Sequence, residues 1–311
     1  MPLPLQFAVT AWSFAHDGLA RDFAGQGEIA EALGFHSFWL PENHFGDERS
    51  IPSPLMLLAA VAARTSRIGL GSTSYLLPIR HPLQAAEEVA VLDRLSGGRV
   101  ILGVGRGVQE SMFRAFDVRA ADKRKRFAHN LDIMMKAWQG DAITSEEGDP
   151  VFLAPLPRQR PHPPVWVAAF GPLAIKQAGT LGLPYLASPV ETLARLATNY
   201  TEHGRHAEAA GHPDIGTVPV MRTVFVSDRP HRVREVKAAL ESSPGHAMRE
   251  DGTDIDDWTI VGDRYYVKDR LEEYRARIGM THLIARGRIP TVSDEEQVCC
   301  LESLAAIDLS R

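Results

Sequence analysis

The chain has 311 residues, 44% hydrophobic and 23% charged, which is enough apolar material for the core of one large domain. Its net charge of −5 argues against a nucleic-acid partner, which would require a basic face. No stretch approaches the roughly 18 apolar residues of a membrane helix, and no signal peptide is recognisable, so we expect a cytoplasmic protein without membrane contact.

Segments typical of strands and helices alternate along almost the whole chain. Short, mostly apolar runs after helical patterns indicate strands that are buried on both faces, as in a parallel sheet. Eight strands are predicted, at residues 6–12, 36–41, 67–74, 100–105, 164–170, 184–188, 218–227 and 281–286. Helices are predicted at residues 19–33, 54–65, 82–95, 123–138, 173–181, 191–210, 233–240, 268–278 and 294–307.

Eight strands with intervening helices favour a (β/α)₈ TIM barrel over an open doubly wound sheet. We predict a single domain over residues 1–311, with insertions near 140–163 and 243–259. The second insertion is acidic and ends at Trp258. If this loop reaches the mouth of the barrel, Trp258 could pack over a ligand as a lid, although most such stretches are solvated loops.

A polar cluster, Glu42, Asn43 and His44, follows the second predicted strand. Because catalytic groups of barrels lie at the C-terminal ends of strands, we interpret these three residues as catalytic candidates. His44 would act as a proton donor or would orient the substrate, and a purely structural histidine is the alternative. We expect the side chains of Glu42 and His44 to diverge along the strand, which argues against a metal site here. No other metal-binding motif is found, so no metal is predicted.

The run Leu-Gly-Val-Gly-Arg-Gly at residues 102–107 ends the fourth predicted strand. Its spacing does not match the dinucleotide-binding fingerprint G-x-G-x-x-G. We interpret it as a strand end without bulky side chains, at which a flat ligand can approach the backbone. A simple tight turn is the alternative. His81 precedes a proline-started helix and is expected to be satisfied by the backbone.

Several motifs occur together in a specific order. They are Glu42-x-His44-Phe45, Leu-Gly-Ser-Thr-Ser-Tyr-Leu-Leu-Pro-x-x-His-Pro at 70–82, Leu-Asp-x-Leu-Ser-x-Gly-Arg at 92–99, the glycine run at 102–107, Pro-Val-Trp-Val-Ala-Ala at 164–169, and Val-Gly-Asp at 261–263. In order and spacing they resemble the bacterial luciferase-like flavin monooxygenase family over nearly the whole chain. The resemblance implies a TIM barrel that binds reduced FMN or, in one branch, the deazaflavin coenzyme F-420, across its C-terminal mouth.

The resemblance also implies partners. In the monooxygenase branch a separate flavin reductase supplies the reduced FMN, which reacts with O₂, and the proteins are commonly dimers. The predicted helix at 54–65 is apolar around nearly its whole circumference, so we expect a homodimer built partly on this helix. The alternative is that an insertion of the same chain covers it.

Cofactor-binding residues are carried over by position. The resemblance implies a non-prolyl cis peptide bond between Thr73 and Ser74 beneath the flavin ring, and Gly105 falls where luciferase has a cysteine near the flavin. Arg106 and Arg124 match phosphate-binding arginines, and Gly171 matches a phosphate-binding position that could act through its backbone N–H. Two neighbours of these positions, Val108 and Phe170, are also predicted to contact the cofactor.

Two positions depart from the family pattern. Asn43 stands where luciferase has a histidine, and an asparagine side chain cannot shuttle a proton near neutral pH. Ala174 replaces a phosphate-binding threonine. We therefore expect a monooxygenase that uses reduced FMN and O₂ on a small organic substrate, rather than a luciferase acting on an aldehyde. The alternatives are an F-420-dependent enzyme that transfers hydride and a non-catalytic flavin-binding protein of the same fold.

Overall fold

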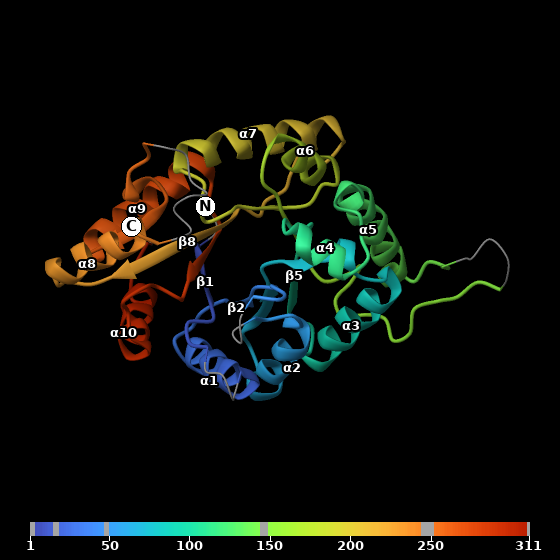
Figure 1. The fold of residues 1–311 in the computed structure, drawn as a ribbon, viewed down its shortest axis with the longest axis horizontal. Coiled ribbons are helices and arrows are strands. Elements are labelled where there is room, and N and C mark those ends of the chain that lie inside the picture. Colours follow the sequence, from blue (N-terminus) through green and yellow to red (C-terminus); the bar gives the residue numbers. More distant parts are fainter. Residues whose placement is uncertain (1–3, 15–18, 47–49, 144–148, 244–251, 310–311) are drawn as a thin grey trace. The chain divides into compact units, whose positions relative to one another are not determined.

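The computed structural model describes residues 4–14, 19–46, 50–143, 149–243 and 252–309. Strands and helices alternate along these residues as the sequence predicts (Figure 1). The strands are β1 (Gln6–Thr10), β2 (Ser37–Leu40), β3 (Gly69–Ser72), β4 (Tyr75–Leu76), β5 (Val100–Gly105), β6 (Val165–Ala168), β7 (Tyr185–Leu186), β8 (Pro219–Val226), β9 (Thr259–Gly262) and β10 (His282–Arg286). The helices are α1 (Leu19–Ala32), α2 (Pro54–Arg64), α3 (Pro82–Leu95), α4 (Glu110–Ala115), α5 (Lys123–Gln139), α6 (Pro172–Thr180), α7 (Leu193–Ala209), α8 (Pro230–Glu241), α9 (Arg264–Ile278) and α10 (Asp294–Ala305). Within the described ranges, none of these helices has the length and apolar character needed to cross a membrane.

The described residues divide into two compact units that alternate along the sequence. Unit 1 consists of those within Met1–Phe14, Ile29–Trp39 and Ala169–Arg311. Unit 2 consists of those within Ala15–Glu28 and Leu40–Ala168. Most of the C-terminal half of the chain therefore lies in unit 1, and most of the N-terminal half lies in unit 2.

Unit 1 is built on a parallel sheet in which β1 lies between β2 and β10, and β10 pairs with β8. All eight residues of β8 are buried. Its first half has a bridge from Val220 to Ala187, just after β7, while its second half pairs with β9. The sequence analysis did not predict β9, which has only four residues and follows a polar segment.

The prediction that Trp258 forms a lid is wrong. Trp258 is only 1% exposed and lies between a 3₁₀ turn, Ile255–Asp257, and β9 in unit 1. Ile255, three residues earlier, is buried as well, so the turn places both apolar side chains in the core. Residues 249–251 of the same acidic segment lie outside the described residues.

In unit 2, β5 is the central strand and is buried along its length. It pairs in parallel with β3, β4 and β6. Helices α3 and α5 are joined by a hydrogen bond from Trp138 Nε1 to the carbonyl of Ala86, at 3.0 Å. The guanidinium of Arg99 donates to carbonyls near the C-terminal end of α2, including Ala62 and Thr65, each at 3.0 Å. These contacts fix the helices whose preceding loops carry the candidate site.

The predicted insertion at 140–163 is attached to unit 2 through a buried carboxylate. Asp93 near the end of α3 is 0% exposed and accepts hydrogen bonds from the backbone N–H and the side chain of Gln159, at 2.8 and 2.7 Å. The insertion also contains an antiparallel bridge between Ile143 and Val151. In its described part, the insertion is thus anchored at the C-terminal end of α3.

The two cysteines, Cys299 and Cys300, are neighbours on α10 and are free thiols. Cys299 is exposed, whereas Cys300 is buried against β8. The Cys300 sulfur accepts a hydrogen bond from the N–H of Val226 at 3.2 Å and lies 3.8 Å from the carbonyl oxygen of Val224. Burial raises the pKa of the Cys300 thiol to about 12.

Candidate active site

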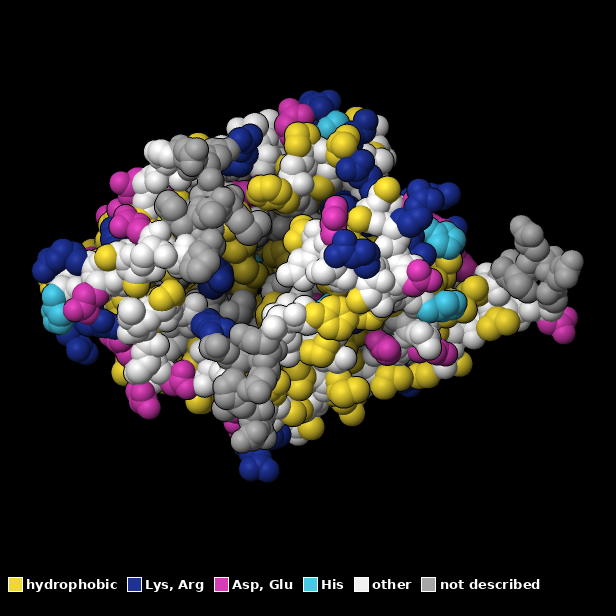
Figure 2. All heavy atoms as spheres, in the orientation of Figure 1, with side chains coloured by type: hydrophobic (Ala, Val, Ile, Leu, Met, Phe, Trp, Pro, Cys, Tyr) yellow, Lys and Arg dark blue, Asp and Glu magenta, His cyan; other side chains and the backbone are white. Residues whose placement is uncertain are grey.

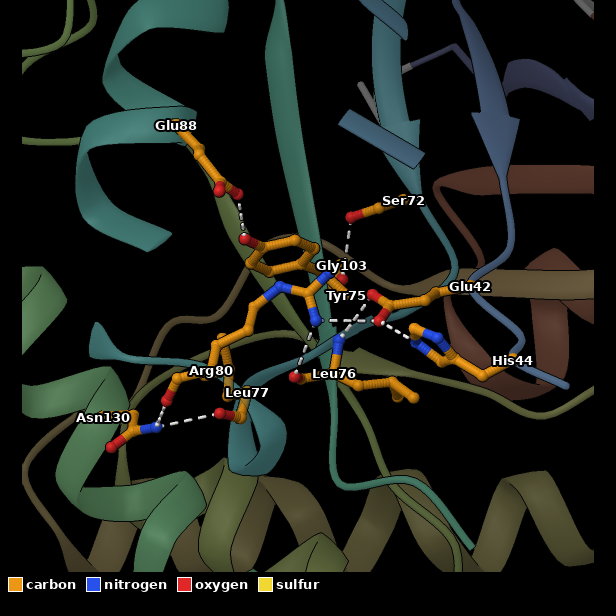
Figure 3. Close-up of polar contacts among 10 residues, drawn as sticks. All are labelled: Glu42, His44, Ser72, Tyr75, Leu76, Leu77, Arg80, Glu88, Gly103 and Asn130. Atoms are coloured by element: carbon orange, nitrogen blue, oxygen red, sulfur yellow. Dashed lines mark hydrogen bonds and ion pairs between the residues drawn. The ribbon is translucent and has the colours of Figure 1, made fainter. Parts of the chain in front are cut away.

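Glu42 lies two residues beyond β2, at the centre of a buried hydrogen-bond network in unit 2 (Figure 3). Its Oε1 accepts hydrogen bonds from His44 Nε2 and from Arg80 Nη1, each at 2.8 Å. Its Oε2 accepts one from the backbone N–H of Leu76 at 3.0 Å. Burying a carboxylate is costly unless its oxygens are bonded, so these three donors explain how Glu42 can be buried here.

The expectation that Glu42 and His44 diverge is wrong. β2 ends at Leu40, so neither residue belongs to the strand, and the chain brings the two side chains into contact. A carboxylate can only accept hydrogen bonds, so Nε2 carries a proton that faces it. Nδ1 is the other ring nitrogen, and it has no hydrogen bond to any other part of the chain that the structure describes.

Arg80 and Tyr75 extend the network toward α3 (Figure 3). The Arg80 guanidinium carbon lies 3.9 Å from the centre of the Tyr75 ring, and the Tyr75 hydroxyl donates to Glu88 at 2.6 Å. Burial raises the pKa of Tyr75 well above its usual value, so the phenol keeps its proton and remains a donor. Burial alone would lower the pKa of Arg80, but Tyr75 and Glu42 outweigh it and raise that pKa.

Helix α5 fixes the turn that carries Arg80. The side-chain amide of Asn130 donates to the carbonyls of Leu77 and Arg80, at 2.8 and 2.9 Å. Arg126 Nε donates to the carbonyl of Pro78, also at 2.8 Å. The position of the Arg80 backbone therefore depends on a helix that begins more than forty residues later in the sequence.

Two phenylalanines flank His44. The ring of Phe116 lies 5.0 Å from the imidazole, and the ring of Phe45 lies 5.7 Å from it. Phe45 is 68% exposed and has a φ of 54°, in the left-handed region. That conformation costs a non-glycine residue roughly 1–2 kcal/mol, and it turns an apolar ring toward solvent beside His44. The imidazole thus lies against an apolar, partly accessible wall.

Just after β3, the side chain of Ser74 lies close to the end of β5. The peptide bond between Thr73 and Ser74 is cis, as the resemblance implies. A Cβ added to Gly105 would lie 2.0 Å from Ser74 Oγ, so no other residue fits at this position without displacement. The two positions that the resemblance assigns to the flavin ring are therefore in direct contact.

Arg106 follows Gly105 and lies over the ring of Phe127, with 4.6 Å between guanidinium carbon and ring centre. Burial, followed by the positive charge of Arg124, lowers the pKa of Arg106 to about 10. An anion bound between the two guanidinium groups would relieve this repulsion, so this pair fits the phosphate of a mononucleotide. Arg124, near the start of α5, is exposed, and so is Val108 at 77%.

The remaining predicted residues do not belong to the Glu42 network. Asn43 is exposed, and its side-chain oxygen accepts the N–H of Ile51 at 2.7 Å, which closes the loop after β2. Phe170 and Gly171 lie in unit 1, directly before α6. Phe170 is 65% exposed, and Gly171 has a φ of 86°.

The sequence analysis missed Arg80, Tyr75, Glu88 and Phe116. Arg80 stands next to His81, which, as expected, is satisfied locally: its Nδ1 accepts the N–H of Leu83 at 3.3 Å at the start of α3. The sequence offered one signal for Arg80: it is a charged residue between an apolar turn and the proline that starts a helix. Its contact with Glu42, 38 positions away, has no local signature.

Comparison with known proteins identifies the family. The family model described as luciferase-like monooxygenase matches residues 7–282. The chain is 28% identical over 212 residues to the oxygenase component of flavin-dependent trigonelline monooxygenase from Acinetobacter baylyi, covering 65% of this chain and 58% of the relative. It is 37% identical over 198 residues to F-420-dependent glucose-6-phosphate dehydrogenase from Kineococcus radiotolerans, covering 60% of this chain and 56% of the relative.

A solved structure supports the fold. The oxygenating constituent of 3,6-diketocamphane monooxygenase from Pseudomonas putida, solved in complex with FMN, has a TM-score of 0.80 at 20% identity, covering 99% of this chain and 98% of that one. This similarity confirms an α/β fold of the TIM-barrel type. The chain spans between 43% and 59% of the length of the first curated relatives that it matches. From its match to the family model, the chain belongs to the luciferase-like monooxygenase family.

Proposed function

We propose that the protein is a flavin-dependent monooxygenase that binds reduced FMN and oxygenates a small organic substrate. The observation that carries the proposal is the contact in unit 2 between Gly105 and Ser74, together with two arginines beside it. Arg106 follows Gly105 in the sequence, and the positive charge of Arg124 acts on Arg106. Gly105 lets the Thr73–Ser74 segment lie directly against the end of β5, where the resemblance places the flavin ring, and two neighbouring guanidinium groups suit a phosphate. When bound, the reduced flavin would supply the electrons that activate O₂.

His44 is the residue of this chain that we propose to move a proton. Glu42 holds Nε2–H, so Nδ1 is the atom that accepts a proton from, or returns one to, a group bound against Phe45 and Phe116. Arg80 positions Glu42 from the other side and does not itself reach this atom of the ring. The two phenylalanine rings would exclude water from one side of the imidazole.

We further propose two protein partners. One is a flavin reductase that delivers reduced FMN, because a relative is named as the oxygenase component of a flavin-dependent system. The other is a second copy of this chain. Met56 on α2 is 76% exposed, and Val91 and Leu95 on α3 are 52% and 58% exposed. Together with His44, Phe45 and Phe116, they line a groove of about 900 Å³. Hydrophobic side chains gather on this part of the surface (Figure 2).

The dimer proposal has a direct test. The described part of the insertion at 140–163 is anchored at the end of α3 and leaves Met56 exposed, so a second copy is the occupant that we favour for the part of this groove formed by Met56, Val91 and Leu95. Met56→Glu together with Val91→Glu should convert a dimer into a monomer in light scattering. A monomeric wild-type protein at micromolar concentration would contradict the proposal.

A second candidate is hydride transfer with coenzyme F-420, which is favoured by the similarity to an F-420-dependent dehydrogenase. Both candidates use the same strand ends but differ in their cofactor and in their need for O₂. Anaerobic titration of the protein with reduced FMN and with reduced F-420, followed by absorbance and fluorescence, separates them. We expect tighter binding of reduced FMN, and O₂ consumption above the protein-free rate when substrate candidates are added. Binding of F-420 alone would overturn the FMN assignment.

A further inference from the structure

Arg286, the last residue of β10, is a partly buried cation in unit 1. Its hydrogen bonding differs from that of Arg222, which lies on the neighbouring strand β8. Arg222 is fully buried, and its guanidinium donates to the Tyr274 hydroxyl at 2.7 Å and to the Glu191 carbonyl at 2.6 Å. Among the residues that the structure describes, the Arg286 side chain makes no hydrogen bond or ion pair. Its positive charge is therefore not neutralised by these residues.

The sheet register places Arg286 on the face away from the helices. In the parallel pairing of β10 with β8, Ala285 lies opposite Arg222 and Arg286 lies opposite Thr223. Paired residues share a face, and successive residues alternate between the two faces. Because Arg222 reaches Tyr274 on α9, its face is the one that helices cover, and Arg286 lies on the other. In a TIM-barrel fold that face is the interior, and the last residue of a strand is at the end where ligands bind.

The chain after Arg286 is held tightly against the end of β1. The N–H of Gly287 donates to Thr10 Oγ1 at 3.0 Å, and a Cβ on Gly287 would lie 2.5 Å from the Thr10 carbonyl and 2.8 Å from the Trp12 Cβ. Arg288, by contrast, is exposed, with its guanidinium carbon 5.3 Å from the centre of the Phe14 ring. The close contact at Gly287 fixes the backbone from which Arg286 projects, so the cation is preorganised.

Burial lowers the pKa of Arg286, and no carboxylate among the described residues compensates for it. A guanidinium in such surroundings gains free energy when an anion replaces the water that it has lost. One cation with a planar, two-pronged donor edge matches one planar anion with two oxygens, which is a carboxylate. A phosphate dianion would require more positive charge than Arg286 alone provides.

We propose that Arg286 binds the carboxylate group of a small organic ligand. This inference concerns unit 1 alone and goes beyond the proposed oxygenase function, whose residues lie in unit 2. It predicts that carboxylates bind to the protein without flavin, whereas matched neutral amides bind much more weakly.

The test compares benzoate with benzamide, and octanoate with octanamide, by isothermal titration calorimetry on the full-length protein without flavin. We expect at least one carboxylate to bind about tenfold or more tightly than its amide. Arg286→Gln should abolish that preference, Arg286→Lys should retain part of it, and Arg288→Gln should leave it unchanged as the matched control. Circular dichroism of each variant establishes that it is folded.

Three results would overturn the proposal. In the first, neither carboxylate binds to the wild-type protein at millimolar concentration, and in the second, the amides bind equally well. In the third, Arg286→Gln loses FMN affinity while carboxylate binding is unchanged, which would assign Arg286 to the cofactor. Because the calorimetry needs no flavin, failure of FMN binding and failure of carboxylate binding are separate outcomes that test the two proposals independently.

Discussion

In the described part of each unit, a buried glutamate lies at the centre of a polar cluster, Glu191 in unit 1 and Glu42 in unit 2. The two clusters differ in whether a polar atom is left without a hydrogen-bond partner. In unit 1, the carboxylate of Glu191 accepts hydrogen bonds from the Tyr185 hydroxyl at 2.7 Å, from the Ser188 N–H at 2.8 Å and from the Asn199 amide at 2.6 Å. Arg222 does not bond this carboxylate but the Glu191 carbonyl, at 2.6 Å. Burial raises the pKa of Glu191.

In unit 2, the carboxylate of Glu42 instead meets a cation, a backbone N–H and an imidazole. The imidazole retains Nδ1, and the neighbouring Phe45 is largely exposed. A polar cluster whose groups satisfy one another fixes a fold, whereas a cluster with an unused titratable nitrogen beside an accessible wall can do chemistry. Burial and hydrogen bonding therefore do not distinguish a structural cluster from a reactive one, whereas a titratable atom without a hydrogen-bond partner does.

Removing Arg222 should have the largest effect, and the effect should be on stability. Arg222→Met leaves the carbonyls of Ser188 and Glu191 without their donor in the core of unit 1. We expect the free energy of unfolding to fall by about 2–6 kcal/mol, because each of these two buried acceptors left without a donor costs about 1–3 kcal/mol. Urea denaturation followed by circular dichroism measures it. Arg229→Met, at an exposed position, is the control, and equal stability of both variants would show that the cluster is not structural.

Removing His44 should affect turnover far more than stability, because Arg80 and the N–H of Leu76 still donate to Glu42. With a substrate that the wild-type protein turns over, His44→Ala should lower turnover about 10²-fold or more, which is the usual contribution of a positioned acid or base. His129→Ala, an exposed histidine on α5, is the control and should retain wild-type turnover. If His44→Ala turns over at the wild-type rate while it still binds FMN, His44 has no part in the reaction.

Glu42→Gln sharpens the same comparison, because it keeps the size of the side chain and leaves His44 in place. It removes the negative charge that faces Nε2–H and one of the two acceptor oxygens of the side chain, so a positioning role predicts lower turnover together with a changed pH profile. A merely structural role predicts lower stability with an unchanged pH profile. Turnover measured across the pH range and urea denaturation of the same variant distinguish the two roles.

Removing Arg106 should have a smaller effect, confined to one chemical group of the cofactor. A charge-assisted hydrogen bond contributes about 1.5–3 kcal/mol, so Arg106→Ala should weaken FMN binding roughly tenfold to a hundredfold. Riboflavin, which lacks the phosphate, should bind the variant and the wild type alike. Lys125→Ala, at an exposed neighbouring position, is the control. Equal losses of FMN and riboflavin affinity would make Arg106 a scaffold residue.

The smallest effect concerns a histidine pair in unit 1. The rings of His36 and His282 are 5.1 Å apart, and burial, followed by the charge of His36, lowers the pKa of His282 from 6.5 to about 4. Between these values the unfolded chain binds a proton that the folded chain does not, so stability falls as the pH drops from about 6.5 to about 4.

His282→Gln should therefore flatten the dependence of unfolding free energy on pH in that window. Urea denaturation at several pH values measures the slope, and His231→Gln, at an exposed position on α8, is the control. An unchanged slope in His282→Gln would mean that other groups control the acid sensitivity of unit 1.

Most of the fold could be predicted because local periodicity and stop signals carry it. The strand at residues 100–105 was predicted with its observed bounds, since a short apolar run between glycines is compatible with few structures other than a buried strand. The long helix predicted at 191–210 begins instead at Leu193, because Thr192 caps it and Glu191 turns into the core. Short elements such as β9 and α4 were missed because a few residues do not establish a period.

The candidate site was predictable only in part. Glu42 and His44 were identified from their position after a strand, but their mutual contact depends on where β2 ends, which no local pattern specified. Arg80 was missed because its role depends on Glu42 and on Asn130, which lie 38 and 50 positions away. Trp258 was misinterpreted because an aromatic residue after a polar loop can lie over a ligand or in a core, and only packing decides.

The thiol of Cys300 gives the molecule an internal reporter of local opening. Because its sulfur is held between α10 and the backbone of β8, and because its pKa is about 12, it should not react with a thiol-labelling reagent while α10 stays in place. The exposed Cys299 next to it should react at once. The slow labelling phase of the wild-type protein would then measure how often the last helix leaves the sheet, without any added probe.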